Sequence, residues 1–274
     1  MASSAQAKTT AKTEGIQTCR ECGGSGWRPE KVGGQRLPKV VPCDCRAEQN
    51  FERLLRRAGI PKRFSDKSLQ NFDHTLDGEE NRSLKSARLR AERFAEDYPV
   101  HRTGLLFHGP CGIGKSHLAV AIVRELTAKG AGAIYCNTKD LLQSLRYSFN
   151  PVAQTTEAEL LRGIIEAEVL VLDDLGAERL TDWVQETMYH VINSRYQADR
   201  TTIITTNLEY GGPSEATADD AQGQSRLSGD TARRAMRKET LGDRVGQRIW
   251  SRLTEMCRPV PMQGEDQREK MRKR

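Results

Sequence analysis

The sequence has little that would suit a membrane or secreted protein. Hydrophobic residues make up 36% of the 274 residues and aromatic residues 5%. No apolar run approaches the roughly 20 residues that a membrane-spanning helix needs, so we expect no membrane contact. The first fifteen residues are rich in Ala, Ser, Thr and Lys and lack the apolar core of a signal peptide. We therefore expect a disordered start over residues 1–14 and a cytoplasmic protein.

A strong charge bias and a disulfide pattern are also missing. The net charge of +6 is a mild basic excess, which suits nucleic acid but equally suits solubility alone. Residues 271–274 form a basic tail, for which a solvated end is the commonplace interpretation. Seven cysteines are an odd number, and in a chain of this length they indicate reduced thiols.

Four of the cysteines form two close pairs, Cys19 with Cys22 and Cys43 with Cys45. Four thiolates suit tetrahedral zinc, although the second pair is C-x-C instead of the commoner C-x-x-C. Such a site has no open coordination position, so the zinc would be structural and would stabilise a small module over residues 15–46. The other three cysteines are interpreted as ordinary small residues: Cys111, Cys136 and Cys257.

The most informative motif is a glycine-rich loop that matches G-x-x-x-x-G-K-[ST] at every fixed position. It predicts a phosphate cradle in which backbone N–H groups face the phosphates, Lys115 reaches the β/γ oxygens and the Ser116 hydroxyl binds Mg²⁺. A strand-like run before the loop and a helix-like run after it make a chance glycine loop a poor alternative. The predicted nucleotide-binding residues of this segment are Gly109, Pro110, Cys111, Gly112, Ile113, Gly114, Lys115, Ser116 and His117.

The rest of the chain alternates helical and strand-like patterns. Residues 47–83 are predicted to form a helical linker, and residues 84–270 an α/β domain with a parallel sheet between two helical layers. Residues 211–240 show no sustained periodicity and are predicted to be a mobile insertion. The predicted strands cover 103–108, 132–136, 169–172 and 201–205, with one more around Val260, and a helix is expected over residues 241–256.

Asp173 and Asp174 follow the apolar strand 169–172, which is the Walker B arrangement. We expect Asp173 to hold Mg²⁺, together with Ser116, and Asp174 to orient or deprotonate the attacking water; an ordinary turn is the alternative. The spacing leaves room for an additional strand between the loop strand and the Walker B strand. Asn207 ends that strand, where its amide would hold the water or a γ-phosphate oxygen unless it only caps a turn.

Three arginines repeat at i, i+4 and i+8 on the helix predicted over residues 241–256: Arg244, Arg248 and Arg252. They flank an apolar stripe formed by Leu241, Val245, Ile249 and Leu253. One interpretation is a solvated basic face. The other is that an arginine enters the nucleotide site of a neighbouring subunit and stabilises the transferred phosphoryl group. Activity would then depend on assembly.

Over residues 50–270 the chain resembles the DnaC/DnaI/IstB group of AAA+ ATPases, which are bacterial and phage helicase loaders and transposition helpers. The resemblance implies an AAA+ domain that binds ATP and self-associates through AAA+ interfaces. It further implies that Asn207 is sensor I, that Arg252 or Arg248 is the arginine finger and that Arg268 takes a sensor II position. The Asp-Asp pair departs from the Asp-Glu of most AAA+ enzymes, as IstB-like members also do, and the insertion over residues 211–240 departs from the family pattern too. The segments that carry the resemblance are AGIPKRF (58–64), LQNF (69–72), the glycine-rich loop, VLDDLG (171–176), NSRY (193–196), TTNL (205–208), RIWSRL (248–253) and GEDQR (264–268).

The function implied by this resemblance is ATP-dependent loading of a DnaB-type replicative helicase onto single-stranded DNA, with hydrolysis as a release switch and the zinc module as the grip on the helicase. No aromatic-rich surface is evident, so affinity for single strands should be modest and salt-sensitive. An IstB-like helper that binds duplex DNA and a transposase is the nearest alternative, although its N-terminal region usually lacks such cysteines. A third possibility is an adaptor that binds nucleotide without hydrolysing it. Asp174→Ala should abolish ATP turnover in a loader or a helper and should change nothing in such an adaptor.

Overall fold

The computed structural model describes residues 19–22, 25, 27–30, 39–76, 78–149, 156–178, 181–213 and 238–268. The chain divides into two compact units, residues 1–52 and 53–274. Three predicted segments lie wholly or largely outside the described residues. They are the disordered start (1–14), the greater part of the insertion (211–240) and the basic tail (271–274).

The first unit contains a short antiparallel hairpin and the beginning of a helix. Strand β1 (Trp27–Glu30) pairs with β2 (Lys39–Pro42), with Trp27 opposite Pro42. Helix α1 (Asp44–Arg57) begins just after β2. Cys19 and Cys22 precede the hairpin and Cys43 follows it, so the pairing of the two strands brings the cysteine pairs to the same end of the hairpin.

The second unit is built on a five-stranded sheet in the order β6-β7-β8-β5-β9, in which every pairing is parallel. Strand β8 lies between the strand before the glycine-rich loop, β5, and the strand that ends in Asp173, β7. This confirms the predicted additional strand. The strands are β5 (Gly104–His108), β6 (Ala133–Asn137), β7 (Val169–Asp173), β8 (Thr201–Thr206) and β9 (Cys257–Pro261).

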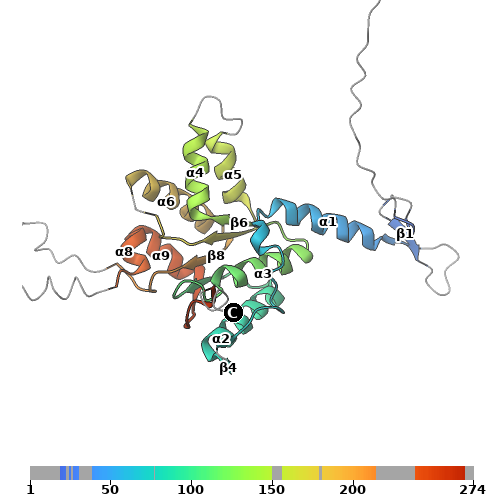
Figure 1. Cartoon of the computed structure of the whole chain (residues 1–274). Coiled ribbons are helices and arrows are strands. Elements are labelled where there is room, and N and C mark those ends of the chain that lie inside the picture. Colours follow the sequence, from blue (N-terminus) through green and yellow to red (C-terminus); the bar gives the residue numbers. More distant parts are fainter. Residues whose placement is uncertain are drawn as a thin grey trace, which may run out of the picture. The chain divides into compact units, whose positions relative to one another are not determined.

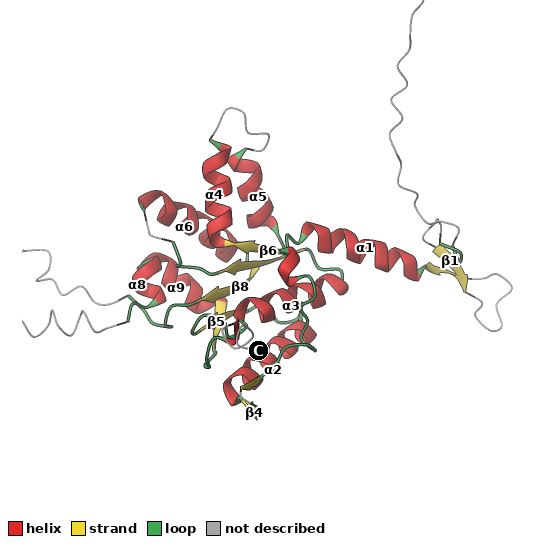
Figure 2. Cartoon of the chain, in the orientation of Figure 1, coloured by secondary structure: helices red, strands yellow, loops and turns green. Residues whose placement is uncertain are grey.

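Helices cover both faces of the sheet, which confirms the predicted three-layer α/β class (Figures 1 and 2). Among the described residues, α2 (Arg82–Asp97) and α3 (Lys115–Ala128) pack on one face. The helices that pack on the other face in the same part of the chain are α4 (Thr138–Ser148), α5 (Glu157–Glu166), α6 (Asp182–Gln197), α8 (Leu241–Val245) and α9 (Gln247–Met256). Short elements precede α2: a 3-10 turn η1 (Lys62–Phe64), β3 (Thr75–Leu76) and β4 (Glu79–Glu80).

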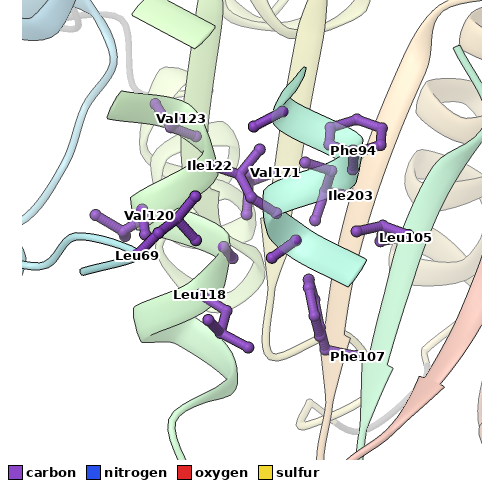
Figure 3. Packing of buried hydrophobic residues seen from close by; sticks show 14 of the residues in the cluster. Leu69, Phe94, Leu105, Phe107, Leu118, Val120, Ile122, Val123, Val171 and Ile203 are labelled. Carbon is purple, nitrogen blue, oxygen red and sulfur yellow. The ribbon is translucent and has the colours of Figure 1, made fainter. Parts of the chain in front are cut away.

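Successive residues of each central strand enter opposite cores, because side chains alternate across a sheet. In β5, Leu105 and Phe107 join one core and Leu106 the other. Figure 3 shows the first core, where Phe107 and other strand residues meet Leu118 and Ile122 of α3. Burial on both faces explains why β5 and β7 are largely continuous apolar runs. The same burial fixes the end of β5, from which the loop to α3 begins.

The structure corrects the helix predicted over residues 241–256. Gly246 has a positive φ of 81° and separates α8 from α9, because a left-handed residue interrupts a helix. The predicted apolar stripe is nevertheless buried, as both Val245 and Ile249 lie in the second core. In the described part of the chain, no helix combines the length and the apolar character that crossing a membrane requires.

Candidate nucleotide-binding site

The glycine-rich loop connects β5 to the N-terminus of α3, as the sequence predicts. Gly109, Gly112 and Gly114 all have positive φ angles, which favour glycine. A Cβ added at Gly114 would overlap the Phe72 ring, and one at Gly112 would overlap the Asp266 carboxylate. The loop therefore depends on bare backbone at these positions. The first N–H groups of α3 and its dipole make the loop suitable for an anion.

Lys115, the first residue of α3, lies within the loop and is only 6% exposed. Its Nζ donates hydrogen bonds to the carbonyl oxygens of Gly109 (2.8 Å) and Pro110 (2.5 Å). Burial lowers the pKa of Lys115 to about 8, because desolvation disfavours the ammonium. Ser116 follows half-buried, Cys111 is exposed and Ile113 is fully buried. The loop carbonyl oxygens carry only a partial negative charge. The charged oxygens of a phosphate would therefore stabilise the Lys115 ammonium more strongly.

Asp173 lies at the end of β7 and is 3% exposed. The hydroxyl of Tyr135 donates to its Oδ2 (2.6 Å) and the hydroxyl of Thr205 to its Oδ1 (2.7 Å). A third hydroxyl, that of Thr138, donates to the backbone oxygen of Asp173 (3.0 Å). Each carboxylate oxygen keeps a further lone pair, so the arrangement is compatible with Mg²⁺ bound through water. Sequence reasoning identified Asp173 but none of the hydroxyls that orient it.

Asp174 and Asn207, predicted to serve the attacking water, lie side by side. The Asn207 amide donates to Asp174 Oδ1 (2.6 Å), and the Asp174 N–H donates to the Thr205 hydroxyl (2.8 Å). Asp174 has a positive φ of 59°. Burial raises the pKa of Asp174, the neighbouring Asp173 raises it further, and Lys115 opposes both. A carboxylate with a raised pKa beside an amide donor suits the orientation of a water and acceptance of its proton.

Arg268, predicted at a sensor II position, lies near the same site. Its positive charge lowers the pKa of both Asp174 and Lys115, which places the guanidinium within electrostatic range of the two groups. Its backbone N–H donates to Asp266 Oδ1 (2.9 Å). Residues 262–268 therefore bring the Arg268 guanidinium near the nucleotide site and the Asp266 carboxylate onto the glycine-rich loop.

The three arginines of the predicted ridge have different surroundings. Arg244 binds the carbonyl oxygen of Gly176 (2.6 Å) and pairs with Glu239, so it ties α8 to the turn after Asp174. Arg248 and Arg252 both lie on α9 against the ring of Tyr189 on α6, with guanidinium carbons 3.8 Å and 4.9 Å from the ring centre. Cation–π contact of this kind holds a guanidinium in a defined direction.

Arg252 is held more firmly than Arg248. Its Nε donates to Asn193 Oδ1 (2.7 Å) and a terminal nitrogen donates to the Tyr189 hydroxyl (3.1 Å). The side chain of Arg248 is 64% exposed and lies 3.6 Å from Glu186. The structure thus places both candidate fingers on one surface.

His117 contacts the segment before α2. Its Nε2 lies 2.9 Å from the Ser68 carbonyl oxygen and 3.0 Å from Asn71 Oδ1. The ring meets Phe72 edge to face, with centres 5.2 Å apart. Burial lowers the pKa of His117. His117 thus ties residues 68–72 to α3, close to where Phe72 packs on Gly114.

The four cysteines predicted as zinc ligands are close together. Their Sγ atoms all lie within 4.8 Å of one another, with 3.8 Å between Cys19 and Cys43 and 3.4 Å between Cys22 and Cys45. Zinc–sulfur bonds of about 2.3 Å place tetrahedral sulfurs about 3.8 Å apart. The thiols therefore fit a tetrahedral metal. Contacts among the four thiols, above all the one with Cys22, raise the pKa of Cys45 and so disfavour its thiolate. A bound cation would instead stabilise the thiolate.

From the sequence we expect no aromatic-rich surface, but the structure brings aromatic side chains together where α4 ends and α6 begins. Tyr147 and Phe149, at the end of α4, are 64% and 57% exposed. The Phe149 ring lies 6.1 Å from that of Trp183 on α6, and the Arg146 guanidinium lies 5.1 Å from the Trp183 ring. We call these four residues the aromatic surface. Sequence reasoning missed it because folding joins two segments that are far apart in the chain.

Together, the β6-β7-β8-β5-β9 sheet, the glycine-rich loop, the paired carboxylates of β7 and the asparagine after β8 define an AAA+ P-loop protein. The chain belongs to the family of IstB-like ATP binding proteins, whose sequence model matches residues 42–227. This confirms the resemblance stated above.

Individual relatives agree with this family. The chain is similar to the replicative helicase loader DnaC of Buchnera aphidicola subsp. Schizaphis graminum, with 26% identity over 59% of this chain and 64% of the relative. It is also similar to the replicative helicase loader DnaC of Escherichia coli K12, with 25% identity over 57% of this chain and 62% of the relative. The match thus spans less than two thirds of the length of these curated relatives.

Solved structures agree on the fold. A crystal structure of the DnaC helicase loader is similar to 74% of this chain and all of that one, with 28% identity and a TM-score of 0.55. A crystal structure of DnaI is similar to 76% of this chain and 93% of that one, with 24% identity and a TM-score of 0.51. This similarity supports the fold alone.

Proposed function

We propose that this protein is an ATP-dependent loader that places a DnaB-type replicative helicase on single-stranded DNA in the cytoplasm. The observation that carries the proposal is the hydrogen bond between Asn207 and Asp174 beside the glycine-rich loop, in a chain similar to DnaC helicase loaders. Hydrolysis would act as a switch that releases the helicase.

The site residues divide the work of phosphoryl transfer. The N–H groups of residues 112–116 and the ammonium of Lys115 would bind the phosphates of ATP. Ser116 and Asp173 would hold Mg²⁺, which neutralises charge on the phosphates when bound. Asp174 would accept the proton of the attacking water, which Asn207 orients. Arg268, whose charge already acts on Asp174 and Lys115, would contact the γ-phosphate.

Self-association would complete the site. Arg248 and Arg252 share one surface of α9 and the same Tyr189 ring. One of them would enter the nucleotide site of the next subunit and stabilise the transferred phosphoryl group, as in ATPases that use a finger in trans. Turnover would then rise with protein concentration.

The aromatic surface supports contact with single-stranded DNA. Exposed rings stack on bases without regard to sequence, and a nearby guanidinium adds attraction to the phosphates. Tyr147 and Phe149 are exposed enough to serve in this way. The earlier expectation of modest affinity rested on the absence of such rings, so we now expect stacking to contribute.

The cysteine module supports contact with the helicase. The thiol spacing fits a tetrahedral zinc ion, which would have a structural role because all four positions are sulfur. A small module that carries its own metal can fold apart from the ATPase domain. We assign it the grip on the helicase.

A loading reaction tests the proposal. The helicase, this protein and ATP are mixed with circular single-stranded DNA that carries an annealed strand, and strand displacement is measured. We expect displacement to require both this protein and ATP, and Asp174→Ala to abolish ATP turnover. A wild type that turns over no ATP, so that Asp174→Ala changes nothing, would instead favour the non-hydrolysing adaptor.

Membership in the IstB-like family keeps the transposition helper as a second candidate. Such a helper would bind duplex DNA more tightly than single strands. Fluorescence anisotropy with matched labelled DNAs separates the two functions. Preference for duplex DNA, together with no strand displacement, would reject the loader.

A further inference from the structure

Residues 262–268, here called the C-terminal strap, follow β9 and lie against the glycine-rich loop. The Met262 N–H donates to the His108 carbonyl oxygen (2.9 Å), and the Gln267 N–H donates to that of Gly112 (3.3 Å). The other side of the strap is attached to the start of α2. There the Gln263 N–H donates to the Ser83 hydroxyl (3.1 Å), and Asn81 Nδ2 donates to the Gln263 oxygen (3.2 Å). The strap is thus fastened at the start and in the middle of the loop.

Within the strap, the Asp266 carboxylate lies directly on Gly112. Both carboxylate oxygens and Cγ occupy the space that a Cβ on Gly112 would need. Gly112 is the middle glycine of the loop and has a positive φ of 73°, and its N–H belongs to the set that the motif directs at phosphate. A carboxylate is therefore held at the edge of a site built for anions.

The same carboxylate has a second role in the strap. Its Oδ1 accepts the Arg268 N–H (2.9 Å), so it fixes the turn that leads to Arg268. One side chain thus combines a charge that opposes phosphate with an oxygen that orients the backbone of the neighbouring cation. An asparagine at position 266 would separate the two roles. Its Oδ1 would still accept the hydrogen bond, but the side chain would carry no charge.

We propose that Asp266 determines the affinity of the nucleotide site, because its negative charge on Gly112 weakens the binding of nucleotide phosphates and speeds their release. This inference rests on the proposed ATP site. Like charges a few ångströms apart at a partly buried site repel strongly. A site that releases nucleotide quickly suits a switch, because each cycle then depends on fresh ATP.

The test measures the binding of a fluorescent ATP analogue by the full-length protein. The variant Asp266→Asn removes the charge and keeps the acceptor for Arg268. We expect it to bind about five to ten times more tightly than the wild type, mainly through slower dissociation, and the gain to shrink as salt rises. Glu79→Gln, which removes the same charge from the exposed strand β4, serves as the matched control and should bind like the wild type.

Asp266→Ala separates charge from backbone orientation, since it removes both. Equal or weaker binding by Asp266→Asn, with normal binding by the wild type, would overturn the inference. A loss confined to Asp266→Ala would mean that the carboxylate only orients the strap. If neither the wild type nor any variant binds the analogue, the nucleotide site itself fails and the inference with it. Circular dichroism melting establishes that each variant is folded.

Discussion

Thr205 connects the Asp173 carboxylate to the backbone of Asp174. Its hydroxyl donates to Asp173 Oδ1 (2.7 Å) and accepts the Asp174 N–H (2.8 Å). The residue is 1% exposed, so water cannot replace either bond. Valine has nearly the same shape and removes both bonds. The bond to the carboxylate contributes about 1.5–3 kcal/mol and the bond from the amide about 1 kcal/mol. We therefore expect Thr205→Val to lower the free energy of unfolding by about 3 kcal/mol.

The same substitution should impair hydrolysis. Asp174 would lose the contact that holds its left-handed backbone beside Asn207, so kcat should fall about tenfold or more while KM changes little. Urea unfolding measures the stability, and phosphate release at saturating ATP measures kcat. Thr205→Ser keeps the hydroxyl and is the control. If the valine and serine variants matched in both assays, the hydroxyl bridge would have no role and the reasoning would be refuted.

Three further predictions concern other parts of the molecule. Burial lowers the pKa of Lys115 to about 8, and phosphate binding needs the ammonium. The affinity for ATP should therefore be constant below about pH 8 and fall up to about tenfold per pH unit above it. Titration calorimetry measures this affinity, and an affinity that does not change with pH would contradict the prediction. Arg195 is fully buried and donates five hydrogen bonds to acceptors that include the last carbonyls of α5. Arg195→Met should therefore cost about 3 kcal/mol in urea unfolding, and a cost under about 1 kcal/mol would disagree. Cys19→Ser should lower the zinc content measured by atomic emission, and unchanged zinc would remove the zinc assignment.

The sequence predicts the sheet and the loop well, because both are local or periodic signals. Buried parallel strands such as Val169–Asp173 are continuous apolar runs. The spacing of the loop motif fixes Lys115 at the first position of α3. The position of β8 between β5 and β7 also follows from the number of elements between the two motifs.

Other features depend on long-range contacts that carry no local signal. The hydroxyls of Tyr135 and Thr205 meet at Asp173 from β6 and β8, and nothing in their own segments marks them. The aromatic surface joins α4 to α6 in the same way. Gly246 is visible in the sequence, but a single glycine inside a helical pattern is usually tolerated. Asp266 becomes notable only when the strap is seen on Gly112.

The central claim is that this protein delivers a replicative helicase. Light scattering of the full-length protein mixed with the helicase of its host, with and without ATP, tests it most directly. We predict a stoichiometric complex that is lost when residues 1–46 are deleted, since the cysteine module is assigned the grip. Two unmixed species under every nucleotide condition would contradict the claim and favour the transposition helper.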